Sequence, residues 1–185
     1  MPKKQQITRE DVVAAALELV RDAGAETLGA RAVAARLGVS TQPIFSHFSS
    51  MKELEAEVLR AAYARYEARI ADAIAKDERP YRASGMAYIA FAREEPRLFR
   101  WLFMRDRSAE PESATGELET ILSLLQEKLG LAREDALWFH LEMWVVVHGI
   151  ATMTATNYLH LDENTISGIL TDLYAGLLKR YGKEL

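Results

Sequence analysis

Apolar residues recur at the spacing of an α-helix along most of the chain. In the segment that begins near Ser50 they occupy every fourth position, at Leu54, Val58, Ala62, Tyr66, Ile70 and Ile74. Because an α-helix has about 3.6 residues per turn, such a row drifts slowly around the helix surface. We therefore expect one long helix whose two ends pack against different parts of the protein.

The remaining segments also predict helices. A first helix begins after Thr8, whose side chain can form a capping box with Asp11, and it ends at Gly24. Apolar periodicity predicts further helices around residues 86–91, 118–129, 133–156 and 166–181, and a short aromatic segment follows Pro96. Residues 104–113 are polar and contain Pro111, which indicates an exposed loop.

The segment between Leu28 and Leu54 packs two short helices and a tight turn into few residues. Gly38 supplies the backbone conformation that a sharp turn between helices requires, and Val39 anchors the turn from inside. The helix before the turn has one apolar face, formed by Ala30, Val33, Ala34 and Leu37.

The helix after the turn has the character of a DNA-reading element. Ser40 or Thr41 can cap it, and Pro43 suits its first turn. Its spacing directs three apolar side chains toward the core, namely Ile44, Phe45 and Phe48. The outer face is then left to small polar groups fit to contact base edges or phosphates, namely Thr41, Gln42, Ser46 and His47.

This segment resembles the signature of TetR-type transcriptional regulators. The resemblance rests on Leu28, Arg31, Ala34, Leu37, Gly38, Val39, Ser40, Ile44, Phe45, His47, Phe48, Ser50 and Leu54, and on Ile7, Ala15, Ala16, Leu19 and Gly24 before them. It implies an all-α fold with a three-helix helix-turn-helix domain over residues 1–50 and a larger effector-binding and dimerisation domain over residues 51–185. The residues implied in DNA binding are Arg31, Ser40, Thr41, Gln42, Pro43, Phe45, Ser46, His47 and Lys52.

Three positions depart from the pattern that the family usually shows. Gly29 stands where threonine is usual, Phe45 keeps the ring of a common tyrosine without its hydroxyl, and Met51 replaces a usual lysine, with Lys52 one place later. Each departure removes a group that could contact a phosphate. Each lost contact is expected to weaken the salt dependence of DNA binding by about 0.9 in the log–log slope.

Composition and charge agree with a regulator that reads DNA locally. The chain has 185 residues, 49% of them hydrophobic, and a net charge of −4, so its DNA-binding surface must be local. The tail with Lys3 and Lys4 is either an arm along the phosphate backbone or an ordinary solubilising terminus. The chain has no cysteine, which excludes disulfides and thiolate metal sites. Its start has no signal peptide pattern, and the apolar run from Met143 is judged too short to span a membrane, so the expected location is the cytoplasm.

The helix from Trp138 to Met153 is apolar nearly all round. It is therefore either a central core helix or a helix that packs on its own subunit with one side and on a partner with the other. By resemblance to the family, this helix and the last one form a four-helix dimer interface, which small residues in the last helix would allow to pack closely. The interface residues expected are Trp138, Val145, Ile169, Leu173, Gly176 and Leu177.

The larger domain also holds the candidates for a ligand pocket. Trp144, His148 and Gly149 resemble the signature of a WHG-type subgroup of TetR effector domains, although His148 is favoured as a hydrogen-bonded residue of the core or dimer interface over one that faces a cavity. The expected effector is mainly hydrophobic, since few buried charges are foreseen. The expected lining residues are Met86, Phe91, Phe103, Trp138, Met143, Trp144 and His148.

These features favour a homodimeric repressor that binds a palindromic operator and is released by a small molecule. No cofactor is expected, and no metal, because no carboxylate is spaced to complete a site with His140 and His148. A helical enzyme is the first alternative, although the chain has no GxSxG, HExxH or phosphate-binding glycine loop. A ligand-binding dimer that has lost DNA binding is the second, suggested only by Gly29, Phe45 and Met51.

Overall fold

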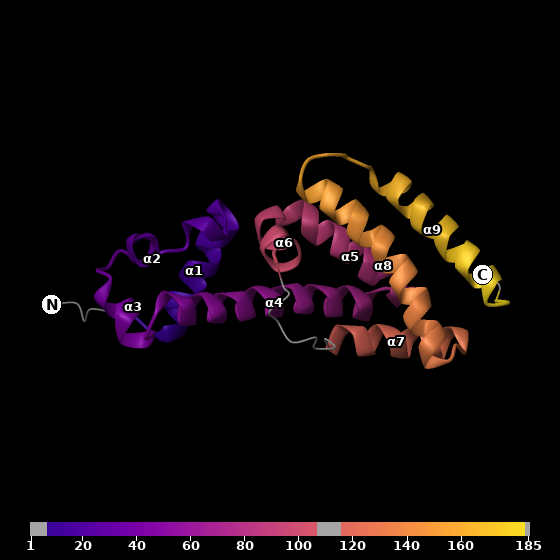
Figure 1. Cartoon of the computed structure of the whole chain (residues 1–185), viewed down its shortest axis with the longest axis horizontal. Helices are drawn as coiled ribbons and strands as arrows, with labels where there is room; N and C mark the ends of the chain where they lie inside the picture. Colours follow the sequence, from indigo (N-terminus) through magenta and orange to yellow (C-terminus); the bar gives the residue numbers. More distant parts are fainter. Residues whose placement is uncertain (1–6, 107–115, 184–185) are drawn as a thin grey trace. The chain divides into compact units, whose positions relative to one another are not determined.

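The computed structural model describes residues 7–106 and 116–183, and within them the chain is helical without a strand (Figure 1). The all-α prediction is confirmed. Lys3 and Lys4, and most of the predicted loop, lie outside the described residues. The helices are α1 (Arg9–Ala23), η1 (Ala25–Thr27), α2 (Ala30–Leu37), α3 (Gln42–His47), α4 (Met51–Lys76), α5 (Pro80–Glu94), α6 (Pro96–Phe103), α7 (Gly116–Leu129), α8 (Arg133–Ala155) and α9 (Glu163–Arg180).

By packing, the chain separates into two units. The first contains the chain up to Tyr66 together with Arg97–Arg105, and the second contains Glu67–Pro96 and the chain from Asp106. The division by packing therefore runs through α4 and assigns α6 to the first unit, whereas the family resemblance predicts a domain boundary at residue 50. The apolar residues at every fourth position of α4 lie on both sides of this division, and they are buried from Leu54 to Ile70.

The first unit is built from α1, α2, α3, α6 and the first part of α4. Thr8 and Asp11 form the predicted capping box, with N–O distances of 2.9 and 3.1 Å. Gly38 ends α2 in the left-handed conformation, with φ of 68°, and its amide donates to the last turn of the helix. The core beneath the helix-turn-helix is formed by Val12, Ala16, Val20, Val33, Ile44, Phe48, Leu54 and Val58.

The α6 helix packs on α4 within this first unit. The Tyr63 hydroxyl donates to the carbonyl of Leu102 over 3.1 Å, and the ring of Phe103 lies edge-on to Tyr66 at 5.0 Å. Phe99 is fully buried beside Phe103. Phe103, expected in the ligand pocket, is therefore part of the packing of the first unit.

The second unit is a helical bundle in which α8 packs against α5, α7 and α9. One side of α8 is buried in this bundle through Phe139, Met143, Val147 and Ile150. Aromatic rings fill the end of the bundle near the start of α5: Phe139 lies 5.4 Å from Tyr174 and 6.2 Å from Tyr81. The apolar helix predicted around Trp138 to Met153 thus forms the centre of the bundle.

By length and composition alone, α8 could cross a membrane, so the expectation that this apolar run is too short was wrong. The helix has 23 residues, and a third of its most apolar window is buried inside the protein. A core helix of a helical bundle meets the same criterion, and α8 has bundle neighbours on three helices.

Replacing Gly38 tests the turn that orients α3. A Cβ at Gly38 would meet no atom within 4 Å, so the cost of Gly38→Ala comes from the left-handed backbone alone. We expect the free energy of unfolding to fall by about 1–2 kcal/mol. Gly38→Asn should retain most of the stability, because asparagine tolerates this conformation. Urea unfolding measures both variants, and an equal loss for alanine and asparagine would contradict the backbone explanation.

Candidate functional site

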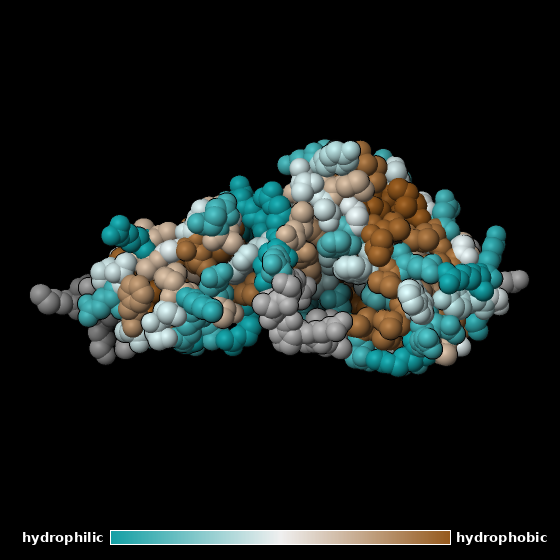
Figure 2. All heavy atoms as spheres, viewed as in Figure 1, coloured by the Kyte–Doolittle hydropathy of each residue, from teal (hydrophilic) through white to brown (hydrophobic). Residues whose placement is uncertain are grey.

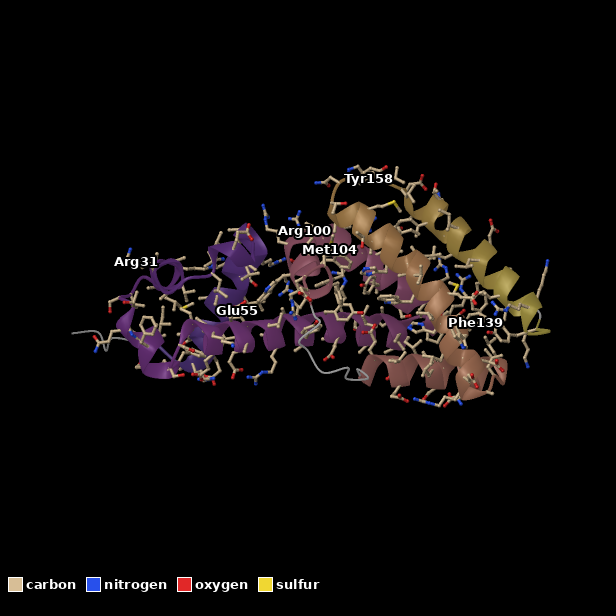
Figure 3. The ribbon with its side chains drawn as sticks, in the orientation of Figure 1. Arg31, Glu55, Arg100, Met104, Phe139 and Tyr158 are labelled. Atoms are coloured by element: carbon tan, nitrogen blue, oxygen red, sulfur yellow. The ribbon has the colours of Figure 1, made fainter. Side chains whose placement is uncertain are left out.

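The exposed side of α2 and α3 carries most of the residues predicted to bind DNA. Arg31 projects from α2 into solvent, as Figure 3 shows, and Lys52 is exposed in the first turn of α4. Thr41 and Pro43 are half-buried. The exposed set in and before α3 is Ser40, Gln42, Phe45 and Ser46.

The spacing of the apolar residues predicts that Phe45 points toward the core, but in the structure its side chain is exposed. Its side chain is 52% exposed, whereas Ile44 and Phe48 are almost fully buried. Ile44 and Phe48 stand one helical turn apart and share the inner face of α3, while a step of one residue rotates Phe45 by about 100°. An exposed aromatic ring on this helix can make apolar contact with a thymine methyl group.

No side-chain hydroxyl caps the start of α3, although Ser40 or Thr41 was expected to do so. Thr41 is the N-cap residue of α3, but its side chain makes no capping hydrogen bond and its backbone is helical. The Ser46 hydroxyl donates to the carbonyl of Pro43 over 2.7 Å. The Thr41 side chain therefore keeps its hydrogen-bonding capacity for another partner.

His47 is held by the protein itself. Its Nε2 lies 2.8 Å from the carbonyl of Ile7, and its own carbonyl accepts from Arg9 Nη1 over 2.6 Å. The Arg9 guanidinium also lies over the ring of Phe48, 4.2 Å from the ring centroid. These contacts fix the end of α3 to the start of α1, a positioning role that the sequence pattern did not reveal.

The same arginine connects α1 to the first turns of α4. Arg9 Nη2 donates to Glu53 over 3.0 Å and to Glu57 over 2.8 Å. Glu53 also accepts hydrogen bonds from the hydroxyl and the amide of Ser49. Together with the hydrogen bond from Arg9, these two bonds lower the pKa of Glu53 from 4.5 to about 2. The hydrogen bond from Arg9 is the main cause of the lowered pKa of Glu57. Arg9 is thus committed to internal contacts, which leaves phosphate binding to other cations.

The lowered pKa of Glu53 predicts acid sensitivity of the first unit. A carboxylate with a depressed pKa contributes stability that is complete above its unfolded pKa and is lost as the pH falls through its folded value. We expect the urea midpoint to fall between pH 4.5 and about 2, and Ser49→Ala to make this fall shallower because it removes a donor to Glu53.

The matched control is Glu55→Gln, which changes an exposed carboxylate of the same helix. Its stability should follow the wild-type pH profile. An unchanged profile for Ser49→Ala would contradict the assignment of the hydrogen bonds to Glu53.

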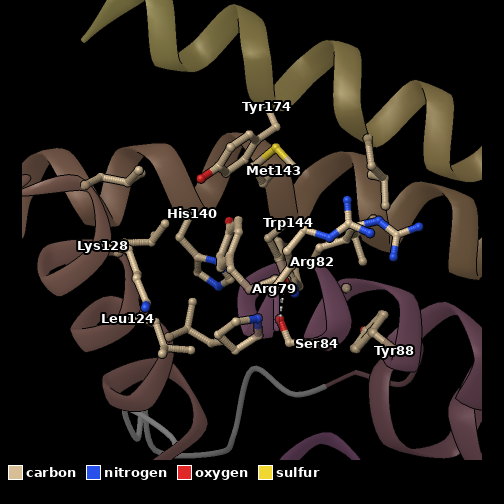
Figure 4. Close-up of a pocket in the computed structure, with 18 of the residues that line it drawn as sticks. Arg79, Arg82, Ser84, Tyr88, Leu124, Lys128, His140, Met143, Trp144 and Tyr174 are labelled. Atoms are coloured by element: carbon tan, nitrogen blue, oxygen red, sulfur yellow. Dashed lines mark hydrogen bonds between the residues drawn. The ribbon is translucent and has the colours of Figure 1, made fainter. Parts of the chain in front are cut away.

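A cavity of about 330 Å³ lies inside the second unit, between α5, α7, α8 and α9 (Figure 4). Its volume is in the range typical of small-molecule pockets. The walls are mostly apolar and aromatic. They include Tyr81 and Tyr88 from α5, Ile121 and Leu125 from α7, Met143, Trp144 and Val147 from α8, and Leu170 and Tyr174 from α9.

Two tyrosine–histidine pairs form the polar part of this region. The Tyr81 hydroxyl lies 3.3 Å from Nδ1 of His140, and the Tyr88 hydroxyl lies 2.8 Å from Nδ1 of His148. Burial lowers the pKa of His140 to about 4, so this imidazole is neutral near pH 7. Burial also lowers the pKa of His148 and raises that of Tyr81. The pocket therefore presents neutral hydrogen-bonding groups among apolar walls.

Of the residues predicted to bind a ligand, Met143 and Trp144 line the cavity. Met86 lines a separate hollow near Ile166, and Phe91 is buried in the core. His148 is hydrogen-bonded to Tyr88 and stacked on Trp144 at 4.8 Å, so it contacts two residues of the wall. The sequence pattern missed Tyr81, Tyr88, His140 and Tyr174, whose pairing depends on contacts between distant helices.

The outward side of α8 and α9 exposes apolar side chains. Trp138 is 52% exposed and Val145 57%, and Ile169 is exposed on α9. Leu173 is half-buried and Gly176 exposed, whereas Leu177 is buried against its own chain, contrary to its predicted place in an interface. We call the exposed set the α8–α9 face: Leu137, Trp138, Leu141, Trp144, Val145, Ile169 and Gly176.

No group of three or more histidine, aspartate or glutamate side chains within the described ranges is arranged to hold a metal ion.

Comparison with known families identifies the class of this protein. Residues 12–58 match the family described as bacterial regulatory proteins, tetR family, and residues 81–173, half of the chain, match the tetracyclin repressor-like C-terminal domain. The chain therefore belongs to the TetR family of transcriptional regulators, a family of DNA-binding regulators and not of enzymes. The WHG-type subgroup stays a prediction.

Solved structures agree in fold. A TetR family regulator from Vibrio parahaemolyticus is 17% identical with a TM-score of 0.65, covering 90% of this chain and 96% of that chain. A TetR-like regulator from Rhodococcus sp. RHA1 is 16% identical with a TM-score of 0.65, covering 94% and 96%. A TetR variant from Acinetobacter baumannii, in complex with minocycline, is 20% identical with a TM-score of 0.56, covering 95% and 98%. No curated protein matches the sequence significantly.

Proposed function

We propose that the protein is a homodimeric repressor that binds a palindromic operator and is released by a small, mainly hydrophobic effector. The observation that carries this proposal is the exposed side of α3, whose Gln42 and Phe45 project from a helix fixed by buried neighbours on its other side. Binding of the effector is assigned to the cavity between α5, α7, α8 and α9.

The DNA contacts divide by chemistry. Gln42 can bond an adenine edge in the major groove, and Phe45 can contact a thymine methyl group. Arg31, Lys52 and the Thr41 hydroxyl are suited to phosphates, which set the position of the protein without specifying sequence. His47 contributes by holding α3, since its Nε2 is engaged by the carbonyl of Ile7.

The dimer is assigned to the α8–α9 face. Figure 2 shows apolar residues gathered over α8 and α9, where a soluble monomer would expose polar ones. Among the residues that the structure describes, a Cβ at Gly149, Gly168 or Gly176 would meet nothing within 4 Å, so no packing within that part of the chain explains these glycines. Close approach of a second copy does. Two copies would present their α3 helices to half-sites about 34–36 Å apart or a multiple of that distance.

Selection of random duplex DNA by the purified protein tests the DNA-binding part. We expect a palindromic sequence to be enriched. Gln42→Ala should relax the preference at one base pair of each half-site, with a loss of about 1–3 kcal/mol in the binding free energy that discriminates between bases there. Lys52→Gln is the comparison variant. It should weaken binding to all sequences alike and lower the salt slope by about 0.9.

Sequencing of the bound DNA pool measures the base preference, and titration at two salt concentrations measures the salt slope. If the wild-type protein enriches no sequence at low salt, the repressor proposal fails. The protein would then be a ligand-binding dimer without DNA binding.

Substitution of Val145 tests the dimer. Val145→Glu places a carboxylate in the α8–α9 face, and we expect the sedimenting mass to fall from that of a dimer to that of a monomer, because an unpaired charge in an apolar interface is costly. Ala75→Glu, an exposed position on α4, adds the same charge and should remain dimeric. Analytical ultracentrifugation distinguishes the two, and a dimeric Val145→Glu would refute this assignment of the interface.

A further inference from the structure

We propose that the effector is an amphipathic organic acid, with a flat apolar body inside the cavity and a single acidic group at its rim. This inference rests on the proposed function, because it names the chemical class of ligand for the same pocket. It follows from the polar groups of the cavity that have no partner among the described residues.

The apolar part of the cavity suits a flat ring system. Aliphatic side chains from α7 and α8 form its walls, among them Leu125, Met143 and Val147. The rings of Tyr81 and Tyr174 lie 6.1 Å apart at the same end of the bundle. Such walls bind an apolar body by burial and a flat one by ring contacts as well.

The interior polar groups are neutral. The Tyr81 hydroxyl lies 3.3 Å from Nδ1 of the neutral imidazole of His140, whose other ring nitrogen is Nε2. That Nε2 has no partner among the described residues, and neither does the hydroxyl of Tyr174. Figure 4 shows both side chains at the cavity. A ligand with a hydrogen-bonding atom here satisfies groups that a pure hydrocarbon would leave unpaired.

The rim carries positive charge without internal partners. Arg79 at the start of α5 and Lys128 in the last turn of α7 line the cavity, and their side chains form no ion pair with the described residues. Arg82 lines it too and donates to the Ser167 hydroxyl over 2.9 Å. Two carboxylates oppose these three cations, and one of them, Glu117, already has a partner.

This distribution limits the ligand to one acidic group placed near solvent. Arg79 and Lys128 are exposed and Arg82 is half-buried, whereas the tyrosine and histidine groups of the interior are neutral, so a second charge buried among the apolar walls would lie without a counter-charge. A cationic ligand would meet the unpaired Arg79 and Lys128 at the rim. The expectation from the sequence that the effector is mainly hydrophobic is therefore compatible with a single carboxylate.

Isothermal titration calorimetry at neutral pH with a matched pair of probes tests the class. The probes are 2-naphthoate and its neutral counterpart naphthalene-2-carboxamide, which share the ring system and differ in charge. We expect the full-length protein to bind the acid about tenfold more tightly than the amide. The double variant Arg79→Gln/Lys128→Gln should lose this preference while its affinity for the amide stays unchanged.

The control is Lys76→Gln/Lys179→Gln, which removes two exposed positive charges of the same unit away from the cavity. It should keep the wild-type preference for the acid. Equal affinity for both probes, preference for the amide, or an acid preference that survives in the Arg79→Gln/Lys128→Gln variant would overturn the inference. Absence of binding by both probes would overturn it as well, while the DNA selection experiment, which needs no ligand, decides separately on the repressor.

Discussion

The second unit depends on the fact that α8 is apolar on two sides. One side is buried through Phe139, Met143 and Val147, which assemble the bundle and one wall of the cavity. The other side exposes Trp138 and Val145, and leaving such side chains in water costs free energy roughly in proportion to their apolar area. The cavity and the proposed dimer are thus two consequences of one helix.

In the first unit, polar contacts act together with an apolar core to set the direction of α3. The helix α3 has only six residues, too few to be stable alone, so its direction must be set by its neighbours. Ile44 and Phe48 fix its inner face, and Arg9 and His47 fix its end. Because the contacts of Arg9 with Glu53 and Glu57 also reach α4, α1, α3 and α4 are joined at one guanidinium.

Local pattern predicted the elements better than it predicted side-chain partners. The capping box at Thr8, the glycine turn at Gly38 and the buried row of α4 depend on neighbours in sequence, and each is found. Phe45 was misplaced because in a six-residue helix the apolar positions 44, 45 and 48 do not distinguish which two share the inner face. The tyrosine–histidine pairs of the cavity join residues about sixty positions apart, which no periodicity encodes.

The proposed release by an effector sets a requirement on α4. A ligand shifts an equilibrium only by its difference in affinity for the two states, so the cavity would have to bind the proposed acid more tightly in the released state than in the DNA-bound state. The cavity lies wholly within the second unit, whereas α3 lies in the first. Since α4 is one continuous helix from Met51 to Lys76 that belongs to both units, the proposed function assigns to it the transmission of a change at the cavity to α3. The contacts of Arg9 with Glu53 and Glu57 would then pass the movement of α4 to the end of α3.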